Sequence, residues 1–199
     1  MDDQKKVLDA VVGAVFQGCK IKYTPTGTSA APTGTFDTDG TISTAASRDC
    51  ALFDIGEIVD YAKSTLFMPT YDDENYICVA NTGFLRAIQN DPAWQEVANY
   101  AAPERRLAGE IGKVEKTRFL EETNVLKNTL GTTAYKGEAI FFGGDAVAEG
   151  LVIPEEIRAK IPTDYGRSKG IAWYGMMGFG EVWPTANPGE ARIIHITST

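Results

Sequence analysis

The chain has 199 residues, 43% of them hydrophobic and 23% charged, which fits one domain, or one domain with a smaller lobe, that buries a real core. Its formal net charge is −8, from 19 basic and 27 acidic residues. This balance argues against sequence-specific binding of DNA or RNA and against docking on anionic lipid. No apolar run approaches the roughly 20 residues that cross a bilayer, so we expect no membrane partner.

Three cysteines, Cys19, Cys50 and Cys78, are far apart and form no C-x-x-C pair. Because their number is odd and their spacing is wide, a disulfide scaffold and a cysteine-based zinc site are poor explanations. We therefore expect reduced thiols and folding in a reducing, cytoplasmic environment.

The chain begins with a predicted helix over Asp2 to Gln17, which Gly18 ends. Its apolar residues recur at helical spacing: Val7, Leu8, Val11, Val12, Val15 and Phe16. Ile21 and Tyr23 then indicate a short strand. The stretch from Thr24 to Ser47 is rich in Thr, Ser, Ala, Gly and Pro, which predicts an exposed loop or a hairpin of weak strands.

Helices and a strand alternate in the middle of the chain. Residues 54–65 carry a helical apolar face made of Ile55, Ile58, Val59 and Ala62. Tyr76 to Ala80 is a short apolar run, which predicts a buried strand. Asn81 is placed to cap a helix through Gln89, and Asp91-Pro92 begins another helix. The inward residues of that last helix are Trp94, Val97 and Tyr100.

Strands are favoured after Pro103. Residues 109–124 alternate apolar and polar over part of their length, with Ile111, Val114, Phe119 and Leu120 as the apolar points. Ala139 to Phe142 is a further short strand. Gly143 to Asp145 predicts a turn into a short helix, Asp145 to Gly150.

The last fifty residues combine an exposed segment with two predicted strands. Pro154 to Gly170 is charged and interrupted by proline. The predicted strands are Ile171 to Trp183 and Ala191 to Thr197, with Pro184 to Gly189 as the turn between them. Helices and short strands thus alternate without an even βαβ rhythm, which predicts an α+β fold.

The sequence contains no pattern that indicates catalysis. Its single histidine, His195, lies between Ile194 and Ile196 in the last predicted strand, and one histidine does not make a metal site or a triad. The G-x-S-x-G elbow and the phosphate-binding P-loop are absent. An acidic site around Glu110 and Glu121 remains the enzymatic alternative. We predict no catalytic, cofactor-binding or metal-binding residue and no cofactor.

One stretch resembles a known family. Gly109 to Asn124, which reads GEIGKVEKTRFLEETN, is similar to the GEIG…ETN stretch of tailed-bacteriophage major capsid proteins of the phage N-four type. Further segments agree with this family in order and spacing: residues 76–81, 84–94, 139–146, 178–183 and 191–196. The resemblance covers roughly residues 50–199.

The resemblance implies a Hong-Kong-97-like capsid fold, with an axial-type and a peripheral-type subdomain. Residues 50–170 would form the axial-type subdomain. Residues 1–49 and 171–199 would be a remnant of the peripheral-type subdomain, with the end of its spine helix and a C-terminal strand pair. The family's N-terminal arm, extended loop and most of the spine helix would be missing, as in a fragment, a split gene or a shortened relative.

The function implied is that of a non-enzymatic coat subunit, which self-assembles into the icosahedral phage head around DNA. Its partners would be other copies in hexamers and pentamers, with scaffolding, decoration or portal proteins and at most non-specific contact with the packaged DNA. The protein would be made in the host bacterial cytoplasm and reside in the virion. The alternatives are a capsid-derived interaction or decoration module, and a small soluble enzyme.

Overall fold

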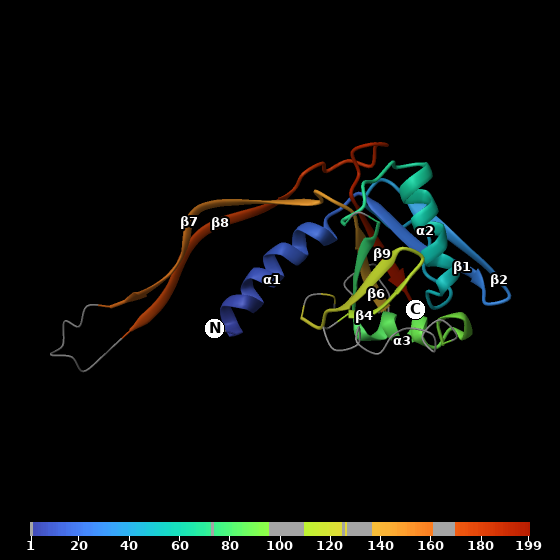
Figure 1. Cartoon of the computed structure of the whole chain (residues 1–199), viewed down its shortest axis with the longest axis horizontal. Coiled ribbons are helices and arrows are strands. Elements are labelled where there is room, and N and C mark those ends of the chain that lie inside the picture. Colours follow the sequence, from blue (N-terminus) through green and yellow to red (C-terminus); the bar gives the residue numbers. More distant parts are fainter. Residues whose placement is uncertain (1, 73, 96–109, 125, 127–136, 161–169) are drawn as a thin grey trace.

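The computed structural model describes residues 2–72, 74–95, 110–124, 126, 137–160 and 170–199. It contains two parts. A mixed sheet with two helices forms the larger part, and a long two-stranded ribbon extends from it beside the first helix, α1 (Asp2–Gln17) (Figure 1). None of the described helices has both the length and the apolar character to span a membrane.

The larger sheet has seven strands in the order β2-β1-β9-β6-β3-β5-β4. The strands are β1 (Ile21–Thr28), β2 (Ala31–Asp37), β3 (Tyr76–Ala80), β4 (Glu110–Val114), β5 (Thr117–Glu121), β6 (Gly137–Phe142) and β9 (Ile193–Ser198). The pairs β1–β9 and β3–β5 are parallel and the other pairs are antiparallel. The last strand of the chain therefore lies inside the sheet.

One face of this sheet is covered by α2 (Leu52–Ser64) and α3 (Thr82–Gln89), whose apolar sides enter the main core. The sheet contributes Phe119, Phe141 and Ile194 to that core, all completely buried. A smaller cluster on other residues of the same strands includes Ile140 and Ile193, with Phe16 of α1 packed against it. Both sides of the central strands are thus covered, which suits their nearly continuous apolar runs.

Most predicted local elements are confirmed. The helix over residues 2–17, the strand over 76–80 and the helix that Asn81 caps all form, with Asn81 accepting a hydrogen bond from the Phe84 amide at 2.9 Å. Residues 92–95 are helical and Trp94 is buried. The predicted inward positions of Val97 and Tyr100 lie outside the described residues.

The predicted exposure of residues 24–47 is wrong at its beginning. The stretch forms the β1–β2 hairpin, which was one of the two expected forms, but Thr24 is completely buried. The reason is that β1 pairs with β9 through Ile21, Lys22 and Tyr23. This pairing draws the first half of β1 into the interior of the sheet.

The predicted helix over Asp145–Gly150 is also wrong. This segment opens β7 (Val147–Ala159), a strand that pairs antiparallel with β8 (Ile171–Glu181) to make the ribbon. A six-residue helix recovers little of the cost of its first turn. The long ladder with β8 satisfies the same backbone groups. In the segment from Pro154 to Gly170, the described residues 154–160 and 170 are exposed, as predicted.

The predicted C-terminal strand pair does not form. β8 pairs with β7, whereas β9 pairs with β1 and β6 in the larger sheet. The turn at 184–189 therefore carries the chain from one sheet to the other. β9 is buried along its whole length, and a strand with apolar residues that are buried on both faces is stabilised more by the centre of a covered sheet than by an exposed ribbon.

Candidate assembly surface

A buried ion pair holds the β1–β2 hairpin against α2. The Arg48 guanidinium contacts both carboxylate oxygens of Asp54 at 2.6 Å, and the Tyr23 hydroxyl donates to the same carboxylate at 2.6 Å. Arg48 also donates to the carbonyl oxygens of Thr26 and Thr33 on the two hairpin strands. Burial, with these carboxylate contacts, raises the pKa of Tyr23. The network therefore fixes the hairpin in one orientation.

A second buried polar network lies at the end of α1. Lys22 Nζ donates to the Gln17 carbonyl at 2.7 Å and lies 3.2 Å from His195 Nδ1, and His195 Nε2 lies 2.6 Å from Glu138 Oε1. Lys22, His195 and Glu138 are each at most 2% exposed. His195 is therefore a satisfied interior residue, in agreement with the structural role predicted for it.

The cysteine thiols and the carboxylates are the side chains that could carry out chemistry. All three cysteines are free and buried, and burial raises the pKa of the Cys19 thiol to about 11. Glu121 is exposed and accepts from the Thr82 hydroxyl at 2.7 Å, whereas the Glu110 side chain lies outside the described residues. In the described part of the chain, no group of three or more His, Cys, Asp and Glu side chains could hold a metal ion.

The two faces of the ribbon differ in how much they are exposed to solvent. Along β8, Gly175, Met177, Phe179 and Glu181 are half-buried, whereas the residues between them are exposed. Alternate residues of a strand share a face, so one face of β8 is partly covered. Helix α1 contacts β8. The α1 side chain of Gln4 also reaches Glu155 on β7.

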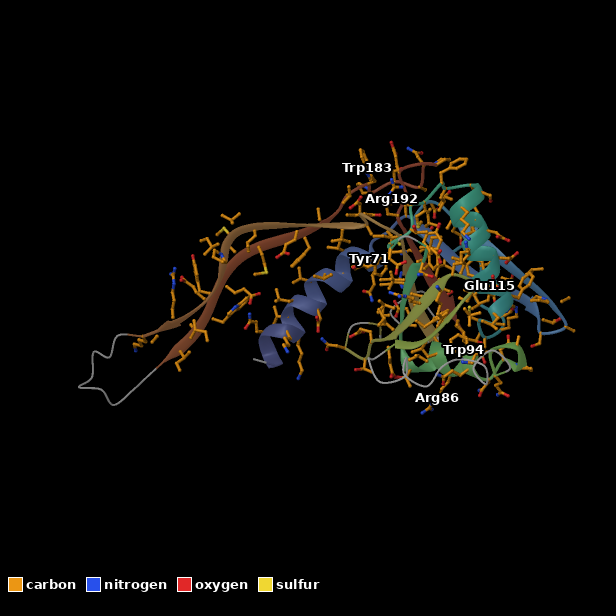
Figure 2. All side chains as sticks on the ribbon, in the orientation of Figure 1. Tyr71, Arg86, Trp94, Glu115, Trp183 and Arg192 are labelled. Atoms are coloured by element: carbon orange, nitrogen blue, oxygen red, sulfur yellow. The ribbon has the colours of Figure 1, made fainter. Side chains whose placement is uncertain are left out.

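The same face continues beyond the half-buried stretch and becomes uncovered there. Trp173 stands opposite Ile157, and Ile171 stands opposite Ala159. Ile157 is 71% exposed, Ile171 is 76% exposed and Trp173 is 37% exposed. Figure 2 shows this outer part of the ribbon with its side chains far from the larger sheet. We call these four residues the outer apolar face.

The opposite side of the outer ribbon is polar and internally paired. Glu156 stands opposite Tyr174, Arg158 forms an ion pair with Glu156, and the Arg158 guanidinium lies 3.9 Å from the centre of the Tyr174 ring. These contacts suit a face in water, where a cation over an aromatic ring is modestly stabilising. The outer ribbon is therefore amphipathic, with one solvated face and one apolar face.

Nearer the sheet, the exposed side of the ribbon is almost flat. Ala148 stands opposite Gly180 and Gly150 stands opposite Gly178, and all four are exposed. A Cβ atom added at Gly178 or Gly180 would meet nothing within 4 Å. Packing inside this chain therefore does not require glycine at these two positions.

Helix α1 has apolar residues on two sides. Leu8, Val12, Val15 and Phe16 are half-buried, and the Phe16 ring packs on Phe142 with ring centres 5.0 Å apart. Val7 and Val11 point elsewhere and are 54% and 47% exposed. A helix with a covered and an uncovered apolar side is typical of one that receives a partner.

The ribbon and α1 therefore present apolar surface that the described chain does not cover. An isolated two-stranded ribbon is marginal in water, and grouped exposed apolar residues mark interaction sites. The arrangement can bind another macromolecule along an elongated surface.

No protein-family model matches the sequence, and no curated protein matches it significantly. Solved structures do match. They include the capsid of Ralstonia phage GP4, with a TM-score of 0.64 and 15% identity over 99% of this chain and 64% of that chain. The head of Helicobacter pylori bacteriophage KHP40 gives a TM-score of 0.62 and 8% identity over 99% and 67%. The chain has the Hong-Kong-97-like capsid fold.

A chain of Mycobacterium phage Che8 is also similar, with a TM-score of 0.59 and 14% identity over 98% of this chain and 59% of that chain. This chain thus spans about 59–67% of the length of these three capsid-fold chains. The predicted fold class is confirmed by structures that share only 8–15% of their residues with this chain.

Sequence reasoning missed the outer apolar face. Its signal is present, because Ile171, Trp173, Met177 and Phe179 share one phase of a two-residue alternation. Their cross-strand partners, Ile157 and Ala159, follow a proline and two glutamates. The sequence predicts a short helix and then an exposed segment in this region instead of one strand. Only the pairing of β7 with β8 places the two sets on the same face.

Proposed function

We propose that the chain is a structural subunit of an icosahedral phage head and that it assembles with other copies of itself. The observation that carries the proposal is the outer apolar face of the ribbon, which nothing in the described chain covers. The capsid-fold likeness to three phage structures supports it. Repetition of one modest contact by symmetry stabilises a closed shell without any catalytic group.

Within the fold, we assign the larger sheet with α2 and α3 to the axial-type subdomain, and α1 with the ribbon to the peripheral-type subdomain. This assignment differs from a division at residues 50 and 170. The pairing of β9 with β1 and β6 favours placing β1 and β9, which lie near the two ends of the chain, in the axial-type part. The length of the ribbon favours placing β7 and β8 together in the peripheral-type part.

The finer assignments rest on sequence resemblance. The stretch from Gly109 to Asn124 supports a capsid protein of the phage N-four type. On that basis the virion head is the proposed location, with synthesis in the host cytoplasm, and a non-enzymatic role is proposed. Scaffolding, decoration or portal proteins and non-specific contact with packaged DNA stay predictions.

The test is the state of the purified chain, followed by light scattering and negative-stain electron microscopy as its concentration is raised. We expect rings, sheets or shells that disappear when Ile171→Ser is introduced. The matched control is Ala172→Ser, which changes the neighbouring residue on the opposite, solvated face. A chain that stays monomeric at every concentration, or assembles equally well with Ile171→Ser, would contradict assembly through this face.

A further inference from the structure

The end of α1 is joined to the sheet by a closed ring of hydrogen bonds among four residues. Lys22 Nζ donates to the Gln17 carbonyl at 2.7 Å, and Lys22 Nζ lies 3.2 Å from His195 Nδ1. His195 Nε2 lies 2.6 Å from Glu138 Oε1, and the Gln17 side chain donates to that same oxygen at 3.4 Å. We call Gln17, Lys22, Glu138 and His195 the α1 ring.

The hydrogen positions in the α1 ring follow from the donors available. An ammonium group can only donate, so Nδ1 of His195 carries no hydrogen and accepts from Lys22. Nε2 then carries the hydrogen and donates to the Glu138 carboxylate. His195 is neutral in this arrangement. Burial is the largest influence on His195 and lowers its pKa, and the charge of Lys22 lowers it further. The Glu138 carboxylate and the backbone of Gln17 oppose this shift.

The α1 ring draws one group from each of four elements: Gln17 from α1, Lys22 from β1, Glu138 from β6 and His195 from β9. Two further groups face Lys22. Cys19 Sγ lies 3.9 Å from its Nζ, with a thiol pKa raised to about 11 by burial, and Glu181 at the end of β8 acts on it through charge. Lys20 faces Glu181. Burial is the largest influence on Lys22 and lowers its pKa.

We propose that the α1 ring is an acid-sensitive latch, in which protonation of His195 releases the last turn of α1 from the sheet. A protonated His195 has a hydrogen on Nδ1 and can no longer accept from Lys22. Two cations would then face each other at a separation now 3.2 Å, inside a low-dielectric interior where like charges repel strongly. Glu138 accepts a hydrogen bond from Nε2 of His195, whereas it acts on Lys22 through its charge, together with Glu181.

Lys22 is the group that moves, because its stem is flexible and the imidazole is held by β9 in the centre of the sheet. Its departure breaks the 2.7 Å hydrogen bond between the ammonium and the Gln17 carbonyl, one of the terminal acceptors of α1. A cation at this end of a helix is stabilising. Since α1 contacts β8, its release also changes the direction of α1 relative to the ribbon. This goes beyond the proposed shell function and does not require assembly.

The test uses the isolated full chain, and its single histidine makes the titration unambiguous. Hydrogen exchange of the amides from Val15 to Gly18 is followed between pH 7.5 and pH 5.0 and corrected for the intrinsic effect of pH. We expect protection of these amides to fall at least tenfold in step with titration of the His195 ring proton signal. In His195→Gln and in Lys22→Met the protection should not depend on pH.

Lys20→Met is the matched control, because Lys20 is an exposed lysine two residues from Lys22 and should leave the pH dependence intact. Lys22→Met should also raise the pKa of His195, which a purely packing role for Lys22 does not predict. Protection of α1 that stays unchanged while the His195 ring signal titrates would overturn the latch. So would a pH-dependent loss that persists in His195→Gln.

Discussion

Large apolar residues are buried in the larger sheet but exposed in the ribbon. In the sheet, Phe141 and Ile194 are completely buried beneath helices. In the ribbon, Ile157 and Ile171 are more than 70% exposed. Burying apolar surface under a second layer stabilises a sheet by about 25 cal/mol per Å². A two-stranded ribbon has no such layer. The apolar residues of the sheet are therefore stabilised within the chain, whereas those of the ribbon remain in contact with water.

Polar residues show the same contrast. Inside the sheet part, Arg48, Asp54 and Tyr23 satisfy one another in the interior. On the ribbon, Glu156 and Arg158 pair at the surface, where each remains about half exposed. Buried pairs depend on both members, whereas exposed pairs contribute little. Substitutions in the two parts should accordingly differ in size and in what they disturb.

The largest loss is expected for Asp54→Ala. It removes the carboxylate from the buried Arg48 guanidinium and also the acceptor of the Ala51 amide at the start of α2. Breaking one partner of a buried ion pair costs about 3–5 kcal/mol of unfolding free energy, which urea denaturation would measure. Asp60→Ala on the same helix is the control, since Asp60 is exposed and should cost less than about 0.5 kcal/mol. Equal losses in the two variants would refute the distinction between buried and exposed charge.

A smaller loss is expected for Asn81→Ala. The Asn81 side chain accepts from the Phe84 amide at 2.9 Å and from the Glu138 amide at 3.2 Å, so it both caps α3 and ties it to β6. Loss of an N-cap side chain costs about 0.5–2 kcal/mol, readable as a lower urea midpoint with an unchanged slope. Asn81→Asp keeps an acceptor and should recover most of the loss. No recovery would mean that another property of Asn81 matters.

A comparable effect is expected from pH through His195. Its pKa is lowered in the folded chain from an ordinary value of 6.5, so the unfolded chain binds the proton first as pH falls. Stability should therefore be constant above pH 6.5 and fall below it, by at most about 1.4 kcal/mol per pH unit. Urea unfolding at pH 7.5, 6.5 and 5.5 would measure this. Subtracting the same series for His195→Gln removes the contribution of the carboxylates, and a difference that does not vary with pH would contradict it.

The smallest effect on stability is expected for Ile171→Ser on the ribbon. Because Ile171 is 76% exposed, the unfolding free energy of the monomer should change by less than about 0.5 kcal/mol. Its consequence should lie in association instead, measured as a shift of the concentration at which light scattering rises. A large loss of monomer stability would mean that the outer apolar face is covered within the chain itself, and the comparison between sheet and ribbon would fail.

The sequence was sufficient for elements whose cause is local. Helix α1 follows from apolar spacing and the stop at Gly18, and α3 follows from Asn81 as its cap. The buried strand over Tyr76–Ala80 follows from its short apolar run. The capsid fold was predicted from the resemblance around Gly109–Asn124, and structural similarity supports it although identity is only 8–15%.

Strand pairing was decided only by the tertiary structure. His195 and Lys22 are 173 residues apart in sequence, and nothing local indicates that β9 would enter the sheet between β1 and β6. Nor does any local pattern choose a strand over a helix for Val147 to Gly150, because β8 supplies the partner. Helical spacing and caps act within a few residues, whereas a strand needs hydrogen bonds and cover from distant segments. The α1 ring and the outer apolar face both depend on such pairing, so both became visible only in three dimensions.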